Sequence, residues 1–178
     1  MTILNRRAPI DQLGFVVASL DEAVAAWTRR FGVGPWTVYR NVTMEGTCRG
    51  AATTVTIDVA LGYRGGEQIE FIEVLSTTSS PYQDEAGRPL EGLHHLAWIV
   101  DDLDAEVAAL KAEGLVPVFS ASNAAVRVVY LGDPAAPGTL FELIDGEGQR
   151  AMHSAGLAAA AAWDGSAAIT EYDFAAAG

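Results

Sequence analysis

The sequence predicts an α+β domain in which two βαβββ modules follow each other in tandem and form one cupped mixed sheet. The first observation is an internal repeat: Asp11 to Trp27 aligns without a gap with His94 to Leu110, 83 positions later. The second is a match between IEFIE at Ile69–Glu73 and FELID at Phe141–Asp145. The third is that each repeat changes from a strand-like apolar run to an Ala-rich segment with helical spacing.

The first module is expected at about residues 10–75. Its opening apolar strand is followed by a polar turn and a helix, and Gly32 lies where a left-handed helix cap costs little. Two further strands, Val55 to Leu61 and Gln68 to Leu75, flank the turn Tyr63-Arg64-Gly65-Gly66.

Residues 76–91 are rich in Ser, Thr, Pro and Gly, which is typical of a linker. The second module follows at about residues 92–145, with Gly114 after its helix. Its expected later strands are a short one and then a pair around Gly132-Asp133-Pro134, at Pro117–Phe119, Val126–Leu131 and Thr139–Asp145.

The repeat pattern stops after Asp145, so residues 1–145 are the predicted domain and residues 146–178 an Ala-rich tail. One short helix is expected in the tail, from Leu157 to Trp163. The tail's aromatic residues indicate that it packs on something, either its own domain or a neighbouring chain.

Composition bounds the function. Half of the residues are apolar and 19% are charged, so the chain should fold. A formal net charge of -12 and a pI near 4.5 argue against a nucleic-acid partner, which requires a basic surface. The same charge disfavours a substrate with many phosphates, unless Arg49, Arg64 or Arg127 is directed into a pocket.

A single cysteine, Cys48, excludes an intramolecular disulfide and fits a reducing compartment. Its expected role is that of a small buried apolar residue. No apolar run approaches the length of a membrane span, and Met1 to Pro9 is not followed by a signal core. We therefore expect a cytoplasmic protein with no membrane partner.

Strand alternation predicts which side chains face a common pocket. On the first strand of each module, the bulky residues should lie under the helix, while a polar residue and smaller ones face the other way. The latter sets are Gln12, Gly14 and Val16 in the first module and His95, Ala97 and Ile99 in the second. By the same alternation Glu70 and Glu142 project from the last strand of each module.

Together these positions offer a carboxamide oxygen, an imidazole and two carboxylates. Such a set suits one Zn, Ni, Co, Mn or Fe ion with room for water or substrate. A lone His on an apolar strand is more often a core histidine. However, two unpaired carboxylates inside apolar strands are costly to bury, which favours a metal site.

The chain resembles the vicinal oxygen chelate superfamily, which includes glyoxalase I, methylmalonyl-CoA epimerase, extradiol dioxygenases and bleomycin-binding proteins. The resemblance covers about Ile10 to Asp145. It is carried by five stretches, DQLGFVVASLDEAVAAW, FGVGPW, IEFIEVLS, GLHHLAWIVDDLDA and GDPAAPGTLFELID. It implies the glyoxalase/bleomycin resistance/dihydroxybiphenyl dioxygenase fold.

Position by position, the resemblance implies that Gln12, Glu70, His95 and Glu142 are ligands of one divalent metal ion. The order Gln, Glu, His, Glu is similar to that of the Gln-containing glyoxalase I. The linker looks more like methylmalonyl-CoA epimerase, whose first ligand is normally His. The implied reaction is removal of a proton next to a carbonyl of a small carbonyl or thioester substrate by an isomerase, epimerase or lyase, with Glu142 as base and Glu70 as its partner.

An extradiol dioxygenase site is disfavoured, because it needs two His on one face, and the adjacent His94 and His95 should point to opposite sides. His94 is therefore expected to be structural, bonded near the helix or the linker. Asp101-Asp102 is better explained by helix capping than by metal binding.

Aromatic pocket contacts are candidates at Trp36, Tyr39, Phe119 and Tyr130, although such residues more often belong to the core. The alternative function is a non-catalytic binding protein of the same fold that sequesters a small molecule. By analogy with the family, a homodimer is expected.

Overall fold

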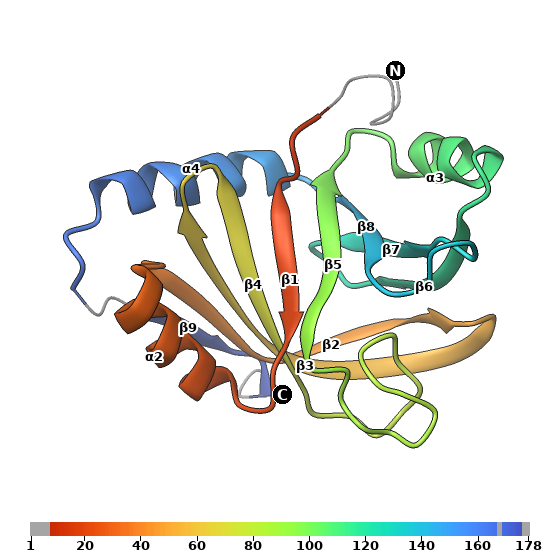
Figure 1. The fold of residues 1–178 in the computed structure, drawn as a ribbon, viewed down its shortest axis with the longest axis horizontal. Coiled ribbons are helices and arrows are strands. Elements are labelled where there is room, and N and C mark those ends of the chain that lie inside the picture. Colours follow the sequence, from red (N-terminus) through yellow and green to blue (C-terminus); the bar gives the residue numbers. More distant parts are fainter. Residues whose placement is uncertain (1–7, 167–168, 176–178) are drawn as a thin grey trace.

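Two copies of the same strand, helix and three-strand order follow each other in the computed structural model, which describes residues 8–166 and 169–175 (Figure 1). The first copy comprises β1 (Gln12–Val16), α2 (Leu20–Phe31), β2 (Trp36–Cys48), β3 (Ala51–Arg64) and β4 (Glu67–Val74). The second comprises β5 (Gly92–Ile99), α3 (Leu103–Ala112), β6 (Val116–Ser122), β7 (Arg127–Gly132) and β8 (Leu140–Asp145). A C-terminal segment adds α4 (Gln149–Ala162) and β9 (Ile169–Asp173).

The nine strands of the described residues belong to one sheet, in the order β3-β4-β1-β5-β8-β7-β6-β2-β9. Because β2 also pairs with β3, the sheet closes on itself and β9 is added outside the ring on β2. The modules join through the antiparallel pairs β1–β5 and β2–β6, whereas β1–β4 and β5–β8 are parallel. The predicted α+β fold with a cupped mixed sheet is confirmed.

The helices of the two modules, α2 and α3, cover the outside of the sheet, on the face predicted from the alternation of side chains along each first strand. Under α2, Leu20 and Val24 pack with Phe71, and the bulky face of β1 joins the same cluster. Under α3, Leu103 and Leu110 pack with strands of the second module in the same way. Burying a side chain such as Leu20 contributes roughly 1.5–3 kcal/mol. The helices therefore fix the orientation of each first strand, and with it the face turned to the interior.

Polar residues cap both helices. The Ser19 hydroxyl accepts a hydrogen bond from the backbone N–H of Glu22, and the Asp102 carboxylate accepts one from Ala105. Gly32 adopts the expected left-handed conformation after α2. Helix capping is therefore confirmed for Asp102.

The structure corrects several predicted boundaries. β2 was not predicted, and the short strand at Pro117–Phe119 extends over Val116–Ser122 as its partner. The tail helix expected at Leu157–Trp163 begins at Gln149, where Gly148 provides no side-chain cap to mark its start. β9 was also not predicted, because its residues are all exposed and it exists only through pairing with the distant β2. The tail thus packs on its own domain.

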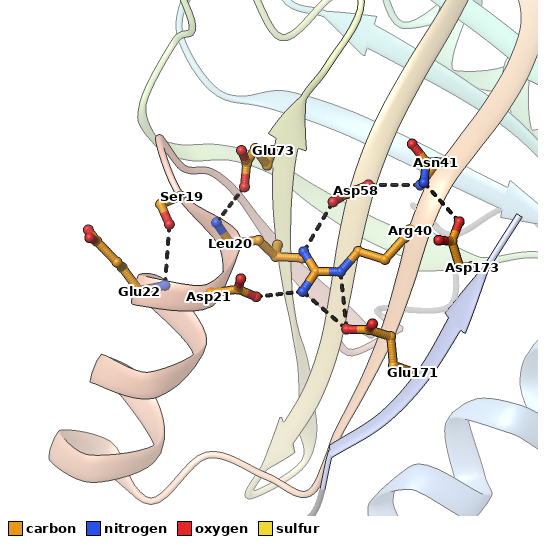
Figure 2. A network of polar contacts seen from close by, with 10 residues as sticks. All are labelled: Ser19, Leu20, Asp21, Glu22, Arg40, Asn41, Asp58, Glu73, Glu171 and Asp173. Atoms are coloured by element: carbon orange, nitrogen blue, oxygen red, sulfur yellow. Dashed lines mark hydrogen bonds and ion pairs between the residues drawn. The ribbon is translucent and has the colours of Figure 1, made fainter. Parts of the chain in front are cut away.

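Arg40 on β2 ties the C-terminal segment to the sheet (Figure 2). Its guanidinium group binds Asp58 on β3, Asp21 at the start of α2 and Glu171 on β9. Asp58 is buried, so the cation compensates a charge that would otherwise be costly in the interior. One side chain thereby joins four elements.

In the described part of the chain, no helix is long and apolar enough to cross a membrane.

Candidate metal centre

The four predicted ligand side chains meet at one point inside the sheet. The Nε2 atom of His95 lies 3.0 Å from Oε2 of Glu142, 3.1 Å from Oε2 of Glu70 and 3.3 Å from Oε1 of Gln12. His95 is fully buried and the other three are largely so. They come from the four neighbouring strands β4, β1, β5 and β8. Residues up to 130 positions apart are therefore brought into one cluster.

Strand register places these side chains symmetrically about the β1–β5 junction. Each module contributes one small residue at this junction. On both neighbouring strands, the residue opposite that small residue is a predicted ligand. The pairs are Gly14–His95, Gly14–Glu70, Ala97–Gln12 and Ala97–Glu142. The repeat therefore produces a pseudo-twofold arrangement with two ligand positions per module.

Two carboxylate oxygens in this cluster lack a hydrogen-bond donor. Although Oε2 of Glu70 and Oε2 of Glu142 lie near Nε2 of His95, both are buried and neither has a hydrogen-bond partner. One imidazole nitrogen carries at most one hydrogen, so it cannot satisfy three surrounding oxygens. Leaving such groups unpaired is expensive, and a cation at the centre removes the cost.

The spacing also fits a bound cation. Two ligand atoms held at about 2.1 Å from one ion and at right angles to each other lie about 3.0 Å apart. The observed contacts of 3.0, 3.1 and 3.3 Å match that separation. Ligand atoms of Glu70, His95 and Glu142 all lie within 4.8 Å of one another. Nitrogen and oxygen donors of this kind suit a divalent first-row metal, with positions left for substrate.

The orientation predicted for His94 was wrong. Gly14 pairs with His95 and Phe15 with Leu93, so His94 is an extra residue in a β-bulge. The bulge breaks the alternation of faces, and both histidines are buried with their Nδ1 atoms 3.1 Å apart. His94 therefore supports His95 directly instead of facing away from it.

Hydrogen-bond partners assign the tautomers of this pair. The Pro81 carbonyl in the linker can only accept, so Nε2–H of His94 donates to it at 2.8 Å. Burial and the neighbouring His95 lower the pKa of His94 to about 4, so it is neutral and its Nδ1 accepts from Nδ1–H of His95. The structural role predicted for His94 near the linker is thus what the geometry supports. Nε2 of His95 is left facing the carboxylates.

The electrostatics of the cluster favour positive charge. Burial opposes the charged form of His95, but the carboxylates of Glu142 and Glu70 outweigh it and raise the pKa of His95 to about 10. Burial also raises the pKa of Glu70. The raised pKa of His95 reflects the two neighbouring carboxylates and that of Glu70 reflects burial, and a divalent ion would neutralise the buried negative charge.

A chain of amides orients Gln12. Its side-chain N–H donates to Oε1 of Gln68 at 2.8 Å, and the amide of Gln68 donates to the hydroxyl of Tyr63. The oxygen of Gln12 is thereby turned toward His95. The prediction did not include Gln68 in the site, although it shares a strand face with Glu70. No sequence signal pointed to Tyr63.

A hollow of about 240 Å³ opens onto this cluster, and Gln12, Glu70 and Glu142 are part of its wall. Tyr39, one of the aromatic residues considered as a pocket contact, also lines this hollow. Trp36, by contrast, belongs to the core under α2. The other two aromatic candidates, Phe119 and Tyr130, are buried in the interior core, Tyr130 against the ring of His95.

Residues of the C-terminal segment also line this hollow, and the prediction included none of them. They are Gln149, Met152, His153 and Phe174. A second hollow of about 420 Å³ lies between α2, β2 and β9 and contains none of the four ligand positions. The smaller hollow is therefore the one that has access to the cluster.

Comparison with known proteins identifies a family. A family model described as the Glyoxalase/Bleomycin resistance protein/Dioxygenase superfamily matches residues 11–130, which is more than half of the chain. No curated protein matches the sequence. The family resemblance predicted from the sequence is thus confirmed.

Solved structures share the fold. A hypothetical protein from Bacillus halodurans is 21% identical with a TM-score of 0.55, over 79% of this chain and 96% of that chain. Methylmalonyl-CoA epimerase from Mycobacterium tuberculosis is 25% identical with a TM-score of 0.52, over 80% of this chain and 91% of that one. A variant of the Streptomyces coelicolor methylmalonyl-CoA epimerase is 20% identical with a TM-score of 0.51, over 78% and 94%.

Proposed function

Because the chain belongs to the glyoxalase/bleomycin resistance protein/dioxygenase superfamily, we propose that it is a metal-dependent isomerase, epimerase or lyase. Its reaction would remove a proton from a carbon next to a carbonyl of a small substrate. The observation that carries the proposal is the convergence of Gln12, Glu70, His95 and Glu142, with two buried carboxylate oxygens that have no hydrogen-bond donor. The similarity to a methylmalonyl-CoA epimerase supports the same class of chemistry.

We assign different tasks to the ligand side chains. A divalent ion held by the four residues would polarise the substrate carbonyl and stabilise negative charge on its oxygen. With the ion bound, His95 would be neutral, and it and Gln12 would be uncharged ligands whose orientations are fixed by His94 and Gln68. Their task is to hold the ion and leave the carboxylates available for proton transfer.

The two carboxylates lie on opposite sides of His95, on β4 and β8. In the proposed mechanism Glu142 accepts the proton as the C–H bond breaks, and the electron pair moves onto the carbonyl oxygen to give the enolate. Glu70, which must be in its protonated form at this point, then gives its proton to the opposite side of the carbon, and proton exchange with water returns both carboxyl groups to their starting states. A carboxylate that neutralises a cation is a weak base, so Glu142 must free one oxygen when substrate binds.

The test combines metal binding with proton exchange. Metal content of protein purified without chelator should be near stoichiometric, and small carbonyl substrates should exchange the adjacent hydrogen for deuterium in D2O, as followed by NMR. Glu142→Gln should keep the metal and lose exchange by about 100-fold or more. Glu147→Gln, the same change at an exposed carboxylate just beyond β8, should alter neither. Full exchange activity in Glu142→Gln would refute the assignment of the base.

The second candidate is a binding protein that sequesters a small molecule, and the largely apolar wall of the hollow favours it. Binding that persists at full affinity after the metal has been removed would support this candidate over the enzyme. The homodimer and the cytoplasmic location remain predictions. Sedimentation of the purified protein measures the first.

A further inference from the structure

We propose that the part of the substrate remote from its metal-binding oxygens is a small, uncharged, apolar group, and that α4 and the residues after β9 help to select it. This inference rests on the proposed function and deepens it. It follows from the residues that line the hollow beside the metal centre, from their charges, from the volume of the hollow and from the C-terminal residues that cover it.

The walls are largely apolar, and their aliphatic residues come from both modules. Ile57, Val59 and Leu61 project from β3, and Val128 and Ile144 project from β7 and β8. These side chains have no polar atom to offer a ligand. Apolar substrate surface that is placed against them gains roughly 25 cal/mol per Å² removed from water.

No Lys or Arg lines this hollow among residues 8–166 and 169–175. The three arginines considered for anion binding are all absent from its wall, and Arg127 is instead paired at the surface with Asp104 and Asp145. The acidic residues in the wall are Glu70 and Glu142, which belong to the metal centre. A carboxylate or phosphate placed here would lose its water and find no Lys or Arg in the described wall as a counter-charge.

The hollow is also small. Its volume of about 240 Å³ lies below the range of about 300–1,000 Å³ that is usual for pockets holding drug-sized ligands. A single ring or a short branched chain beside the chelating oxygens fits this space. A large polar carrier group would have to remain outside it.

The C-terminal segment supplies part of the apolar wall. Met152 on α4 and Phe174 after β9 both line the hollow, and both contact Tyr39 on β2. Figure 1 shows α4 lying across the end of the β3–β4 hairpin and beginning near the start of β1. The predicted domain, residues 1–145, would lack this part of the wall.

Polar contacts fix the segment in place. Glu171 on β9 binds Arg40, and Asp173 accepts a hydrogen bond from the amide of Asn41 (Figure 2). His153 on α4 is buried, with its Nε2 2.9 Å from the backbone oxygen of Asp11, directly before β1. The cover is therefore a built part of the pocket, and its apolar residues can contribute to selectivity.

Three hydroxamates, which chelate metal through two neighbouring oxygens, test the proposal by calorimetry on the metal-loaded protein. Acetohydroxamate reports binding to the metal alone, benzohydroxamate adds a neutral ring, and 4-carboxybenzohydroxamate adds a charge to that ring. We expect benzohydroxamate to bind about 10- to 100-fold more tightly than acetohydroxamate. 4-Carboxybenzohydroxamate should bind at least about 10-fold more weakly than benzohydroxamate.

Variants in the cover separate selectivity from metal binding. Met152→Ala and Phe174→Ala, at side chains that are already partly exposed, should weaken benzohydroxamate by about 3- to 10-fold and leave acetohydroxamate unchanged. Ile169→Ala is the matched control, because this exposed β9 residue does not line the hollow.

The outcomes distinguish this inference from the proposed function. Equal binding of the neutral and carboxylated rings would overturn the inference, and so would wild-type affinities in both cover variants. In either case metal uptake and binding of acetohydroxamate would leave the proposed function standing. Failure to take up metal at all would overturn both.

Discussion

The substitution Gly14→Ala tests the metal centre through a residue that cannot be a ligand. A Cβ atom at Gly14 would lie 1.9 Å from Cε1, 2.0 Å from Nε2 and 2.5 Å from Nδ1 of His95. Ordinary van der Waals contact begins at 3.4 Å, so the imidazole must move by about 1.5 Å to make room. Metal sites tolerate displacements of only about 0.2 Å in their ligand distances.

The expected result is a loss of metal affinity of at least about 100-fold, because an imidazole ligand is displaced and its bond to His94 is disturbed. Overpacking of this kind also costs about 1–3 kcal/mol of folding free energy. For a chain of this size, that corresponds to a fall in Tm of roughly 2–12 °C. Calorimetric titration with Zn²⁺ or Co²⁺ measures the first quantity, and thermal unfolding of the metal-free protein measures the second.

Gly62→Ala is the matched control. Its Cβ would lie 2.7 Å from the Trp36 ring, in the core under α2, so it also overpacks a buried position. We expect a similar loss of stability with metal affinity close to that of the wild type. Wild-type metal affinity in Gly14→Ala, or an equal loss in Gly62→Ala, would refute the reasoning.

Three further changes test the supports of the site and of its cover. His94→Phe removes the acceptor for Nδ1–H of His95 and should weaken metal binding about 10- to 100-fold in calorimetry, whereas His94→Gln should retain more affinity. Chelation of metal initially present at about 100 times its Kd should remove about 2.7 kcal/mol and lower Tm by roughly 5–11 °C in thermal melts. Arg40→Met leaves the buried Asp58 without its cation and should cost about 1–3 kcal/mol in urea unfolding, while neutralising the exposed Asp21 should cost less than about 1 kcal/mol.

The repeat made the centre of the fold predictable. Once the helix of each module was identified, alternation determined which face of each first strand turned inward, and the helices do pack on the other face. The same alternation brought Gln12, Glu70, His95 and Glu142 to one cluster. Strand alternation and the position of each residue in the repeat are therefore enough to predict how the two modules bring these side chains together.

Features that depend on distant partners could not be predicted in this way. The β-bulge at His94 arises from the register between β1 and β5, and strict alternation gives the wrong face there. β9 is exposed throughout and has no apolar pattern; it is a strand because Arg40 and Asn41 bind its acidic residues and β2 pairs with it. The sequence indicated that the aromatic residues of the tail pack on something, but not that Phe174 covers the hollow.

The near symmetry of the frame makes the differences between its halves informative. Glu70 and Glu142 occupy equivalent positions, but the side chain of Glu70 is 14% exposed and that of Glu142 is 5% exposed. In addition, the residue opposite Glu142 on the neighbouring strand is Tyr130, whose hydroxyl contacts that of Tyr82. The residue opposite Glu70 is Leu61. In the proposed mechanism, these unlike surroundings would distinguish Glu142, the proton acceptor, from Glu70, the proton donor. In the proposed mechanism, a duplicated module would thus supply two carboxylates to one ion, and divergence of their neighbours would give them different roles.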